Sequence, residues 1–332
     1  MANNKSDYNN IIITGSIAYD EIMDFSQEFK DYFHPEKLHQ INVSFVVDKL
    51  EKQLGGTATN IAYNSSLILN DKKIKVQILG SVGKDGKDFL RFFKKNKINT
   101  DGIIIDDKLY TASGKVITDI KDNQIWGFYY GASELAEKIN LKKFADKNSL
   151  LVISASHTKS FLHFQREAIE NKIPYLYDPG MTLTWIKDKD LKEGVMNCSY
   201  LIGNDYEMAM ITKRLNVSIN RLIDTGVKVI TTLGEDGVRY EEKSVGNAYM
   251  RSVRVDAYKV KKMVDPTGAG DAWRGGFISG LVTSGLRLEE DRILYALKLG
   301  NVMASFAIEK YGTVNHRPTE KEIKKRMLKL NH

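Results

Sequence analysis

The chain of 332 residues contains a single cysteine, Cys198, and this scarcity excludes two kinds of structural support. One cysteine cannot form a disulfide within the chain, and it cannot build a cysteine-based zinc site. Proteins of the cytoplasm keep their thiols reduced, so the composition favours a cytoplasmic protein. Cys198 stands where a buried apolar run begins, which argues against a nucleophilic role for its thiol.

Long apolar runs are also missing. No stretch approaches the length that a membrane-spanning helix needs, and no signal-peptide pattern precedes Ile11. We therefore expect no membrane partner. The hydrophobic content of 42% still provides for a large core, and neither an internal repeat nor a low-complexity linker divides the sequence. We expect a single domain over residues 1–332.

Two binding signals are absent as well. The formal net charge is +7, but the lysines are scattered and not packed with aromatic residues, so we expect no nucleic-acid partner. The segment 80–84 contains glycines and a lysine, yet it lacks the four-residue spacing and the hydroxyl residue of a Walker A loop. This segment therefore gives no support for a P-loop enzyme.

The sequence does contain short apolar runs that alternate with helical patterns. Strands are predicted over 11–16, 75–80, 149–154, 174–178, 200–203 and 227–232. Helices are predicted over 57–69, 85–93, 161–171, 272–284 and 289–309, with a last amphipathic helix beyond Pro318. Repeated β-α-β units of this kind indicate an α/β fold with a mostly parallel sheet covered by helices.

The run from Asp265 to Asp271 reads Asp-Pro-Thr-Gly-Ala-Gly-Asp and opens a helical pattern. We expect the amides of Gly268, Ala269 and Gly270 at a helix N-terminus, where free N–H groups and the helix dipole bind anions. Asp271 could then accept the proton of an alcohol while these amides neutralise a phosphoryl group in transfer. The alternative interpretation is that Asp271 only caps the helix.

A second polar motif lies near the N-terminus. Gly55 and Gly56 are followed by Asn60 in the first turn of a predicted helix. The glycines let the backbone approach a ligand, and the asparagine amide can both donate to and accept from hydroxyl groups. Asp20 follows the first strand, where a carboxylate could accept hydrogen bonds from two sugar hydroxyls. The alternatives are a local helix cap for Asn60 and a solvated surface acid for Asp20.

These two motifs, in this order, resemble those of the ribokinase-like (PfkB-type) family of carbohydrate and nucleoside kinases over essentially the whole chain. The resemblance implies a three-layer α/β/α sandwich with a mostly parallel central sheet and a small β-sheet lid. Two β-rich segments, about 17–50 and 103–131, would form the lid. The resemblance also implies an ATP-dependent phosphotransferase with Mg²⁺, a K⁺ loop near 310–313 and a homodimer through the lid.

The resemblance assigns roles to particular residues. Asp271 is the expected general base, and the amides of residues 268–270 form the anion hole. The residues expected to bind the acceptor are Asp20, Gly55, Gly56 and Asn60. Those expected to bind ATP and its phosphates are Asn204, Glu207, Thr232, Gly234 and Gly237. Glu207 would act on Mg²⁺ through water, although Asn204 and Glu207 also have the spacing of a capping box.

The runs 14–23 and 38–45 are most similar to the bacterial adenosine kinase branch, which implies phosphorylation of the 5′-hydroxyl of a nucleoside, adenosine above all, near Ser16. Around Tyr110 to Gly114, where this branch would place a base-stacking aromatic residue, the matching stretch has small residues, so no base-stacking residue is assigned there. The alternative within the enzymes is a kinase of ribose, fructose or a sugar phosphate. A ligand-sensing or nucleic-acid-binding protein with this fold is a further alternative, against which the intact Asp271 loop argues.

Overall fold

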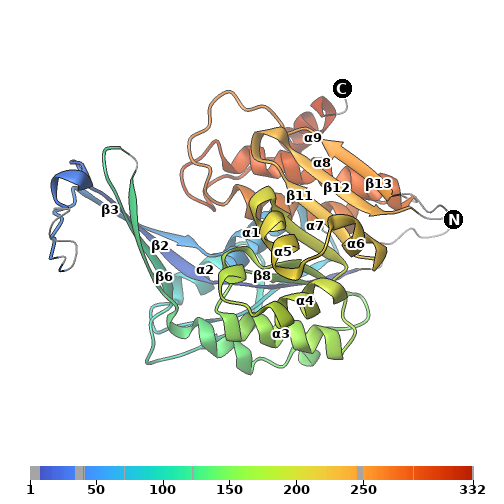
Figure 1. The fold of residues 1–332 in the computed structure, drawn as a ribbon, viewed down its shortest axis with the longest axis horizontal. Coiled ribbons are helices and arrows are strands. Elements are labelled where there is room, and N and C mark those ends of the chain that lie inside the picture. The colour runs from blue at the N-terminus through green and yellow to red at the C-terminus, as the bar shows by residue number, and fades with distance from the viewer. Residues whose placement is uncertain are drawn as a thin grey trace.

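The structure, a computed structural model, describes residues 8–33, 40, 42–70, 72–121, 123–244, 250–286 and 288–330. The main element of these residues is a nine-stranded sheet (Figure 1). All neighbours from β5 to β11 pair in parallel, and β12 and β13 extend one edge antiparallel. The strands, in sheet order, are β13 (Met250–Val255), β12 (Val238–Lys243), β11 (Lys228–Thr232), β10 (Tyr200–Asn204), β9 (Tyr175–Asp178), β8 (Ser149–Ser154), β1 (Asn10–Thr14), β4 (Lys75–Val82) and β5 (Asn99–Ile105).

Alternate side chains of each strand enter different cores, because successive residues of a strand point to opposite faces. In β1, Ile11 and Ile13 belong to one core and Ile12 to the other. Helices cover both faces, which confirms the predicted three layers. The first core lies under α1 (Thr57–Leu69), α2 (Lys87–Lys95), α7 (Ala269–Thr283) and α8 (Glu289–Ala307), with α9 (Glu320–Lys329) packed on α8. The second lies under α3 (Thr158–Glu170), α4 (Asp188–Asn197), α5 (Asp205–Leu215) and α6 (Ile219–Asp224).

A smaller sheet of four strands projects from one side of this sandwich (Figure 1). Its strands, in order, are β3 (Lys49–Gly55), β2 (Ala18–Asp24), β6 (Ala112–Thr118) and β7 (Gln124–Tyr129). The central pair β2 and β6 is parallel, and each outer strand pairs antiparallel. Beyond the end of β2, the rings of Phe25, Phe29, Tyr32 and Phe45 pack against one another. This small sheet corresponds to the predicted lid.

Two details of the predicted lid are wrong. The first lid segment alternates apolar and polar residues over 41–47, which predicts a strand. Residues 42–47 carry no regular secondary structure, and β3 begins at Lys49. Residues 103–105 belong to β5 of the large sheet, so the second lid segment starts with β6. A short apolar run does not reveal which sheet it will join, because that choice depends on distant partners. Of the run 38–45, residues 38, 39 and 41 lie outside the described residues.

Helices α7 and α8 pack closely because glycines occupy their contact. A Cβ atom on Gly276 would lie 2.7 Å from the Leu299 carbonyl oxygen, and one on Gly280 would lie 2.5 Å from the Ala296 Cα. No side chain fits at either position without moving α8. None of the described helices combines the length and apolar character required to cross a bilayer. Short 3₁₀ helices complete the fold: η1 (Phe29–Asp31), η3 (Gly131–Lys138), η4 (Leu141–Lys143), η5 (Gly180–Thr184) and η6 (Gly234–Asp236).

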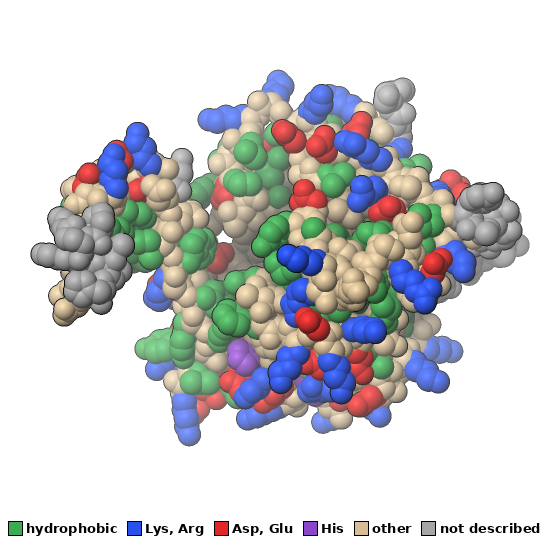
Figure 2. Space-filling view, in the orientation of Figure 1, with side chains coloured by type: hydrophobic (Ala, Val, Ile, Leu, Met, Phe, Trp, Pro, Cys, Tyr) green, Lys and Arg blue, Asp and Glu red, His purple; other side chains and the backbone are tan. Residues whose placement is uncertain are grey.

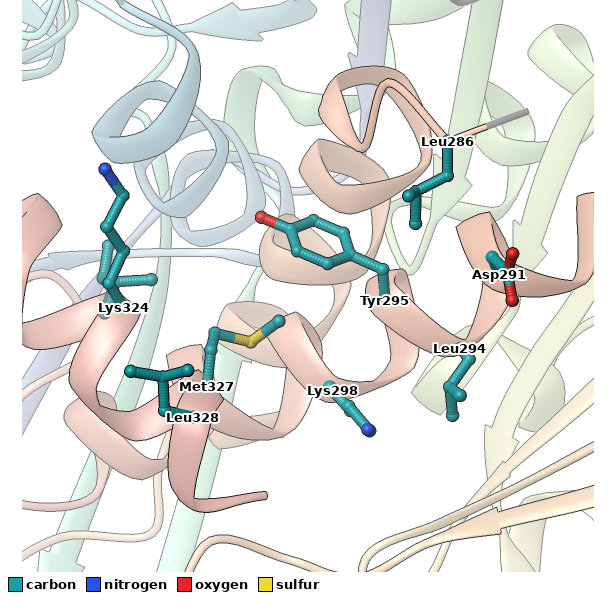
Figure 3. Close-up of a pocket in the computed structure, with 9 residues that line it drawn as sticks. Leu286, Asp291, Leu294, Tyr295, Lys298, Lys324, Met327 and Leu328 are labelled. Atoms are coloured by element: carbon teal, nitrogen blue, oxygen red, sulfur yellow. The ribbon is translucent and has the colours of Figure 1, made fainter. Parts of the chain in front are cut away.

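A pocket of about 570 Å³ opens between α8 and α9 (Figure 3). Its walls are mainly apolar, with charged side chains among them: Leu286, Asp291, Leu294, Tyr295, Lys298, Ile323, Lys324, Met327 and Leu328. The pocket shares no lining residue with the positions predicted for catalysis or binding, so it is separate from the candidate site described next.

Candidate active site

The predicted catalytic loop leads directly into α7. Gly268 is the N-cap residue with φ of 75°, and a Cβ atom there would lie 2.8 Å from the Thr313 side chain, so the turn requires glycine. Asp265 fixes the loop by accepting the amides of Thr267 and Gly312, each at 2.9 Å. The amide of Ala269 donates to the Pro266 carbonyl oxygen at 3.2 Å. Gly270 and Asp271 therefore lie in the first turn of α7.

Asp271 does not cap the helix, so that alternative is wrong. The N-cap position is Gly268 and no side chain caps it, whereas the Asp271 Oδ2 atom accepts a hydrogen bond from Asn60 Nδ2 at 2.8 Å. Burial raises the pKa of the Asp271 carboxyl group, while the Arg274 charge and the Asn60 hydrogen bond lower it. The two sequence motifs thus meet at one carboxylate.

Asn60 has a free acceptor beside this contact. It lies in the first turn of α1, where Gly56 is the N-cap residue, so Asn60 is not a local cap. Its Oδ1 atom is buried and has no hydrogen-bond partner within the described part of the chain. A buried amide oxygen without a partner is costly, and a ligand hydroxyl would satisfy it. The side chain can therefore hold a base and an alcohol at the same time.

Asp20 lies in β2, on the small sheet. Burial, followed by the charges of Asp271 and Asp265, raises the pKa of Asp20 to about 6. The solvated-acid interpretation is therefore wrong. A Cβ atom on Gly55 would lie 2.0 Å from the Asp20 Oδ2 atom, and one on Gly56, whose φ is 87°, would lie 2.4 Å from the Ser16 carbonyl oxygen. The glycine pair makes room for Asp20 and for the Ser16 backbone.

Ser16 holds the start of α1. Its Oγ atom accepts the Thr57 amide at 3.0 Å and lies 3.4 Å from the Thr57 hydroxyl oxygen. The hydroxyl of Thr57 in turn donates to the Ala155 carbonyl oxygen at 2.8 Å. Ser16 is thus fixed at the carboxyl end of β1 by contacts within the protein, and its contact with a nucleoside stays a prediction.

The predicted nucleotide residues gather at the carboxyl ends of β10 and β11. Asn204 pairs in register with Thr232, so these two residues lie side by side. Asn204 and Glu207 form the capping box of α5, with hydrogen bonds of 2.7 and 2.8 Å. The charge of Glu207 also raises the pKa of Asp271 and of Asp178, which places it electrostatically in the site.

The glycines after β11 shape a tight turn. Gly234 has φ of 60° with no atom within 4 Å of its Cβ position, and Gly237 has φ of 90°. A Cβ atom on Gly237 would lie 2.1 Å from the Val255 carbonyl oxygen, so a side chain there would push the start of β12 away from the end of β13. The Thr232 hydroxyl makes only a long contact of 3.5 Å with the Gly203 carbonyl oxygen. Roles for these residues at ATP phosphates stay predictions.

One buried ion pair in the site was missed by sequence reasoning. The Arg274 Nη2 atom donates to Asp178 Oδ1 at 2.7 Å, and Nε lies 2.5 Å from Asp178 Oδ2. Burial raises the pKa of Asp178, and the Arg274 guanidinium acts in the opposite direction. The sequence held one signal for Arg274, its position three residues after Asp271 on a helix, which places both on the same side. Asp178 offered a similar signal, because it ends strand β9.

Two aromatic rings of the small sheet lie near Asp20. Asp20 pairs with Gly114 and Gly114 with Phe128, so the three lie in one row. A Cβ atom on Gly114 would lie 3.3 Å from the Trp126 ring, 3.5 Å from the Phe128 ring and 3.7 Å from Asp20 Oδ1. Trp126 is 57% exposed and Phe128 39%. The rings therefore share the face of the sheet that carries Asp20.

The space-filling view shows the small sheet standing away from the body of the molecule, with a hollow between them (Figure 2). The Phe128 ring contacts Tyr130, with centroids 5.0 Å apart, and Tyr130 contacts His157 at 4.9 Å. Aromatic side chains thus connect the small sheet to the N-terminus of α3. This arrangement can receive a flat ring on one side and phosphates on the other.

The mostly parallel sheet, the helix-borne aspartate and the small sheet beside it define a kinase of the ribokinase-like fold. Residues 16–320 match the family described as pfkB family carbohydrate kinase, and the chain belongs to this family. This membership confirms the predicted family and fold.

Comparison with individual proteins gives the same family. The nucleoside kinase of Methanocaldococcus jannaschii is 29% identical over 305 residues, which span 90% of this chain and 94% of that protein. The Burkholderia thailandensis nucleoside kinase in complex with ADP-inosine has a TM-score of 0.78 at 25% identity, over 96% of this chain and 95% of that one. The ribokinase of Thermotoga maritima shares the fold, with a TM-score of 0.76 at 19% identity over 97% and 100% of the two chains.

Proposed function

We propose that this protein is an ATP-dependent kinase that phosphorylates the 5′-hydroxyl of a nucleoside, with adenosine as the preferred acceptor. The observation that carries the proposal is Asp271, a half-buried carboxylate in the first turn of α7 held by the Asn60 amide. A base at a helix N-terminus can remove a proton from an alcohol at the place where a phosphoryl anion is stabilised. Membership of the pfkB family supports this reaction class.

In the proposed reaction, Asp271 takes the proton of the 5′-hydroxyl as the nucleoside oxygen bonds to the γ-phosphorus of ATP. The bond from that phosphorus to the β,γ-bridging oxygen breaks, and ADP leaves with the electron pair. The amides of residues 268–270 neutralise charge on the transferred group, and Asp20 and Asn60 hold the ribose hydroxyls so that the 5′-oxygen lies in line. Closure of the small sheet over the acceptor would exclude water.

The aromatic rings beside Asp20 favour a nucleoside over a free sugar. Trp126 and Phe128 are exposed on the sheet face that carries the carboxylate, and a nucleobase joined to a ribose held at Asp20 would reach them. Stacking on such rings suits a purine. Two relatives described as nucleoside kinases, one in complex with ADP-inosine, support this choice.

The alternative acceptor is a free sugar such as ribose or fructose, or a sugar phosphate. A sugar phosphate needs a cation at the acceptor site. Arg274 is a cation that folding brings to the site, but its guanidinium is paired with Asp178. We therefore place sugar phosphates after nucleosides and free sugars among the candidate acceptors.

The residues present fit Mg²⁺ held mainly by ATP oxygens and water. No group of three or more His, Cys, Asp or Glu among the described residues is arranged to hold a metal, and Mg²⁺ commonly binds through substrate phosphates and waters. We propose that Glu207 contacts the ion through water, because its carboxylate already accepts the Asn204 amide. When bound, the ion would neutralise charge on the phosphates. A K⁺ site near residues 310–313 is a further proposal.

The test is ADP release with Mg-ATP against adenosine, inosine, other nucleosides, ribose, fructose and fructose 6-phosphate. Asp271→Asn should reduce kcat by roughly 10²- to 10⁴-fold, the contribution of a general base, with an unchanged free energy of unfolding. Asp224→Asn, an exposed residue at the end of α6, is the matched control and should retain the parent rate.

Turnover confined to free sugars would keep the mechanism and replace the acceptor. An Asp271→Asn protein as active as the parent would refute Asp271 as the base. Absence of turnover with every acceptor would refute the kinase proposal and favour a ligand-sensing role.

A further inference from the structure

Arg274 is a buried cation of the candidate site, and it is paired with a buried carboxylate. Its side chain lies on α7, three residues after Asp271, and only 7% of the residue is exposed. Asp178 approaches it from the end of β9, accepting a hydrogen bond from Nη2 and lying close to Nε. A charged hydrogen bond between two buried groups holds the guanidinium in place.

The third nitrogen of the guanidinium faces the catalytic loop. A Cβ atom on Gly270 would lie 2.7 Å from Arg274 Nη1, so this nitrogen packs directly on the Gly270 backbone. Gly270 is one of the three residues whose amides are proposed to receive the phosphoryl group. The absence of a side chain at position 270 is therefore what allows Arg274 to reach the loop.

Several carboxylates lie near Asp271. The charge of Glu207 from α5 raises the pKa of Asp271, and the charge of Asp271 in turn raises the pKa of Asp20 on β2 and of Asp178 on β9. Arg274 lowers the pKa of Asp271, and Asn60 assists it by a hydrogen bond. Arg274 is therefore the cation that favours the ionised form of the Asp271 carboxylate.

Resting on the proposed function, we propose that Asp178 and Arg274 are a positioning pair, in which Asp178 holds the guanidinium against Gly270 so that its charge supports ionisation of the Asp271 carboxylate. The pair contacts neither acceptor nor ATP in this role. It sets the charge state of the base from the next turn of the helix.

Loss of either member of the pair should raise the titration midpoint of Asp271. In Arg274→Met the supporting charge is lost, and the midpoint should rise by about 1 to 2 pH units, the usual effect of one nearby charge. In Asp178→Asn the guanidinium loses the partner that holds it against Gly270, so the midpoint should rise by less than in Arg274→Met. Arg274→Lys keeps the charge but loses the planar guanidinium, so its midpoint should lie between those of Arg274→Met and the parent.

The midpoint is measured by NMR titration of protein labelled with ¹³C at the aspartate carboxyl groups, with Asp271→Asn identifying the signal. The titration needs neither ATP nor acceptor. It therefore tests the effect of Asp178 and Arg274 on Asp271 even if the kinase assay shows no turnover. Arg251→Met is the matched control, because it breaks an arginine–carboxylate pair with Glu242 on the edge strands β13 and β12. The Asp271 midpoint should be unchanged in this control.

Arg274→Met leaves Asp178 buried without its partner and can prevent folding. The double variant Asp178→Asn with Arg274→Met removes both charges and should recover the fold, with a midpoint above that of the parent because the supporting cation is gone. Asp178→Asn alone gives the second measurement. A midpoint that stays within about 0.3 unit of the parent in every folded variant would show that the pair is only structural, since one charge at this range shifts a pKa by 1 unit or more.

Discussion

At the scale of the residue, three carboxylates of the candidate site are fixed by groups from distant parts of the chain. Asn60 holds Asp271, Gly312 holds Asp265 through its amide, and Arg274 holds Asp178. These contacts differ in kind, because one is a neutral side chain, one is backbone and one is charged. The charge state of the site therefore depends on the whole fold and not on the catalytic loop alone.

The aromatic rings of the small sheet give a prediction at the same scale. Trp126→Ala and Phe128→Ala should each raise the KM for a nucleoside by roughly 10- to 100-fold, because base stacking on an aromatic ring contributes about 1–3 kcal/mol. The KM for ATP should not change. Steady-state kinetics with adenosine and inosine would measure both constants.

Ile125→Ala is the matched control, since Ile125 directly precedes Trp126 on β7 and points to the opposite face. It should leave the nucleoside KM unaltered. Equal effects of all three substitutions would mean that the strand is perturbed and that the rings do not bind the base.

At the scale of the element, the contact between α7 and α8 determines where the N-terminus of α7 lies. Gly280→Ala should lower the free energy of unfolding by about 1–3 kcal/mol, because the added methyl group would lie 2.5 Å from the Ala296 Cα and overpack the contact. The gain in helix propensity, about 1 kcal/mol at most, acts against this loss without cancelling it. Urea denaturation followed by circular dichroism provides the measurement.

Gly127→Ala serves as the control, since a methyl group there meets no atom within 4 Å. The change in its free energy of unfolding should stay below about 0.5 kcal/mol. A Gly280→Ala protein as stable as the parent would show that α8 moves aside at little cost.

Elements with a strong local signal were predictable from the sequence. The helix over 57–69 is confirmed with the same bounds, and the capping box of Asn204 and Glu207 is confirmed by both of its hydrogen bonds. Strand period and cap chemistry are properties of a few consecutive residues, which explains this success. The turn that leads into α7 was predictable for the same reason, because its glycines and Pro266 determine the backbone conformation of the residues next to them.

Features that depend on contacts across the fold were not predictable. The alternation over 42–47 gave no strand, and residues 103–105 joined the large sheet. The pairing of Asp178 with Arg274 joins positions 96 residues apart, and the sequence around either residue does not identify its partner. The face of the small sheet on which Trp126 and Phe128 lie follows from the strand register, which pairs Phe128 with Gly114 and Gly114 with Asp20. The sequence alone does not reveal these pairings.

At the scale of the whole molecule, the segment after α8 joins the first third of the chain to the catalytic loop. The Thr313 hydroxyl donates to the Leu54 carbonyl oxygen at 3.2 Å, and the Gly312 amide donates to Asp265. Displacement of this segment would disturb the glycine pair and the loop together. A homodimer through the small sheet stays a prediction, which light scattering can measure.

His316 of this segment makes stability depend on pH. Its Nε2 atom lies 2.7 Å from Asn64 Oδ1, the Tyr63 hydroxyl donates to its carbonyl oxygen, and the residue is buried. Burial lowers the pKa of His316 from 6.5 to about 4. Between pH 6.5 and about 4, His316 is protonated in the unfolded chain but not in the folded one. The free energy of unfolding therefore decreases as the pH falls from about 6.5 to about 4. The loss should reach about 3 kcal/mol, at 1.36 kcal/mol per pKa unit.

His316→Gln removes this titration while keeping a donor to Asn64. Urea unfolding of parent and variant at pH 7, 6, 5 and 4 isolates the effect of His316, because the carboxylates titrate alike in both proteins. The parent should lose more stability than the variant across this range, and the difference should approach about 3 kcal/mol near pH 4. Parallel curves would mean that the folded protein accepts the proton on His316, and that the contact between this segment and α1 opens well before the molecule unfolds.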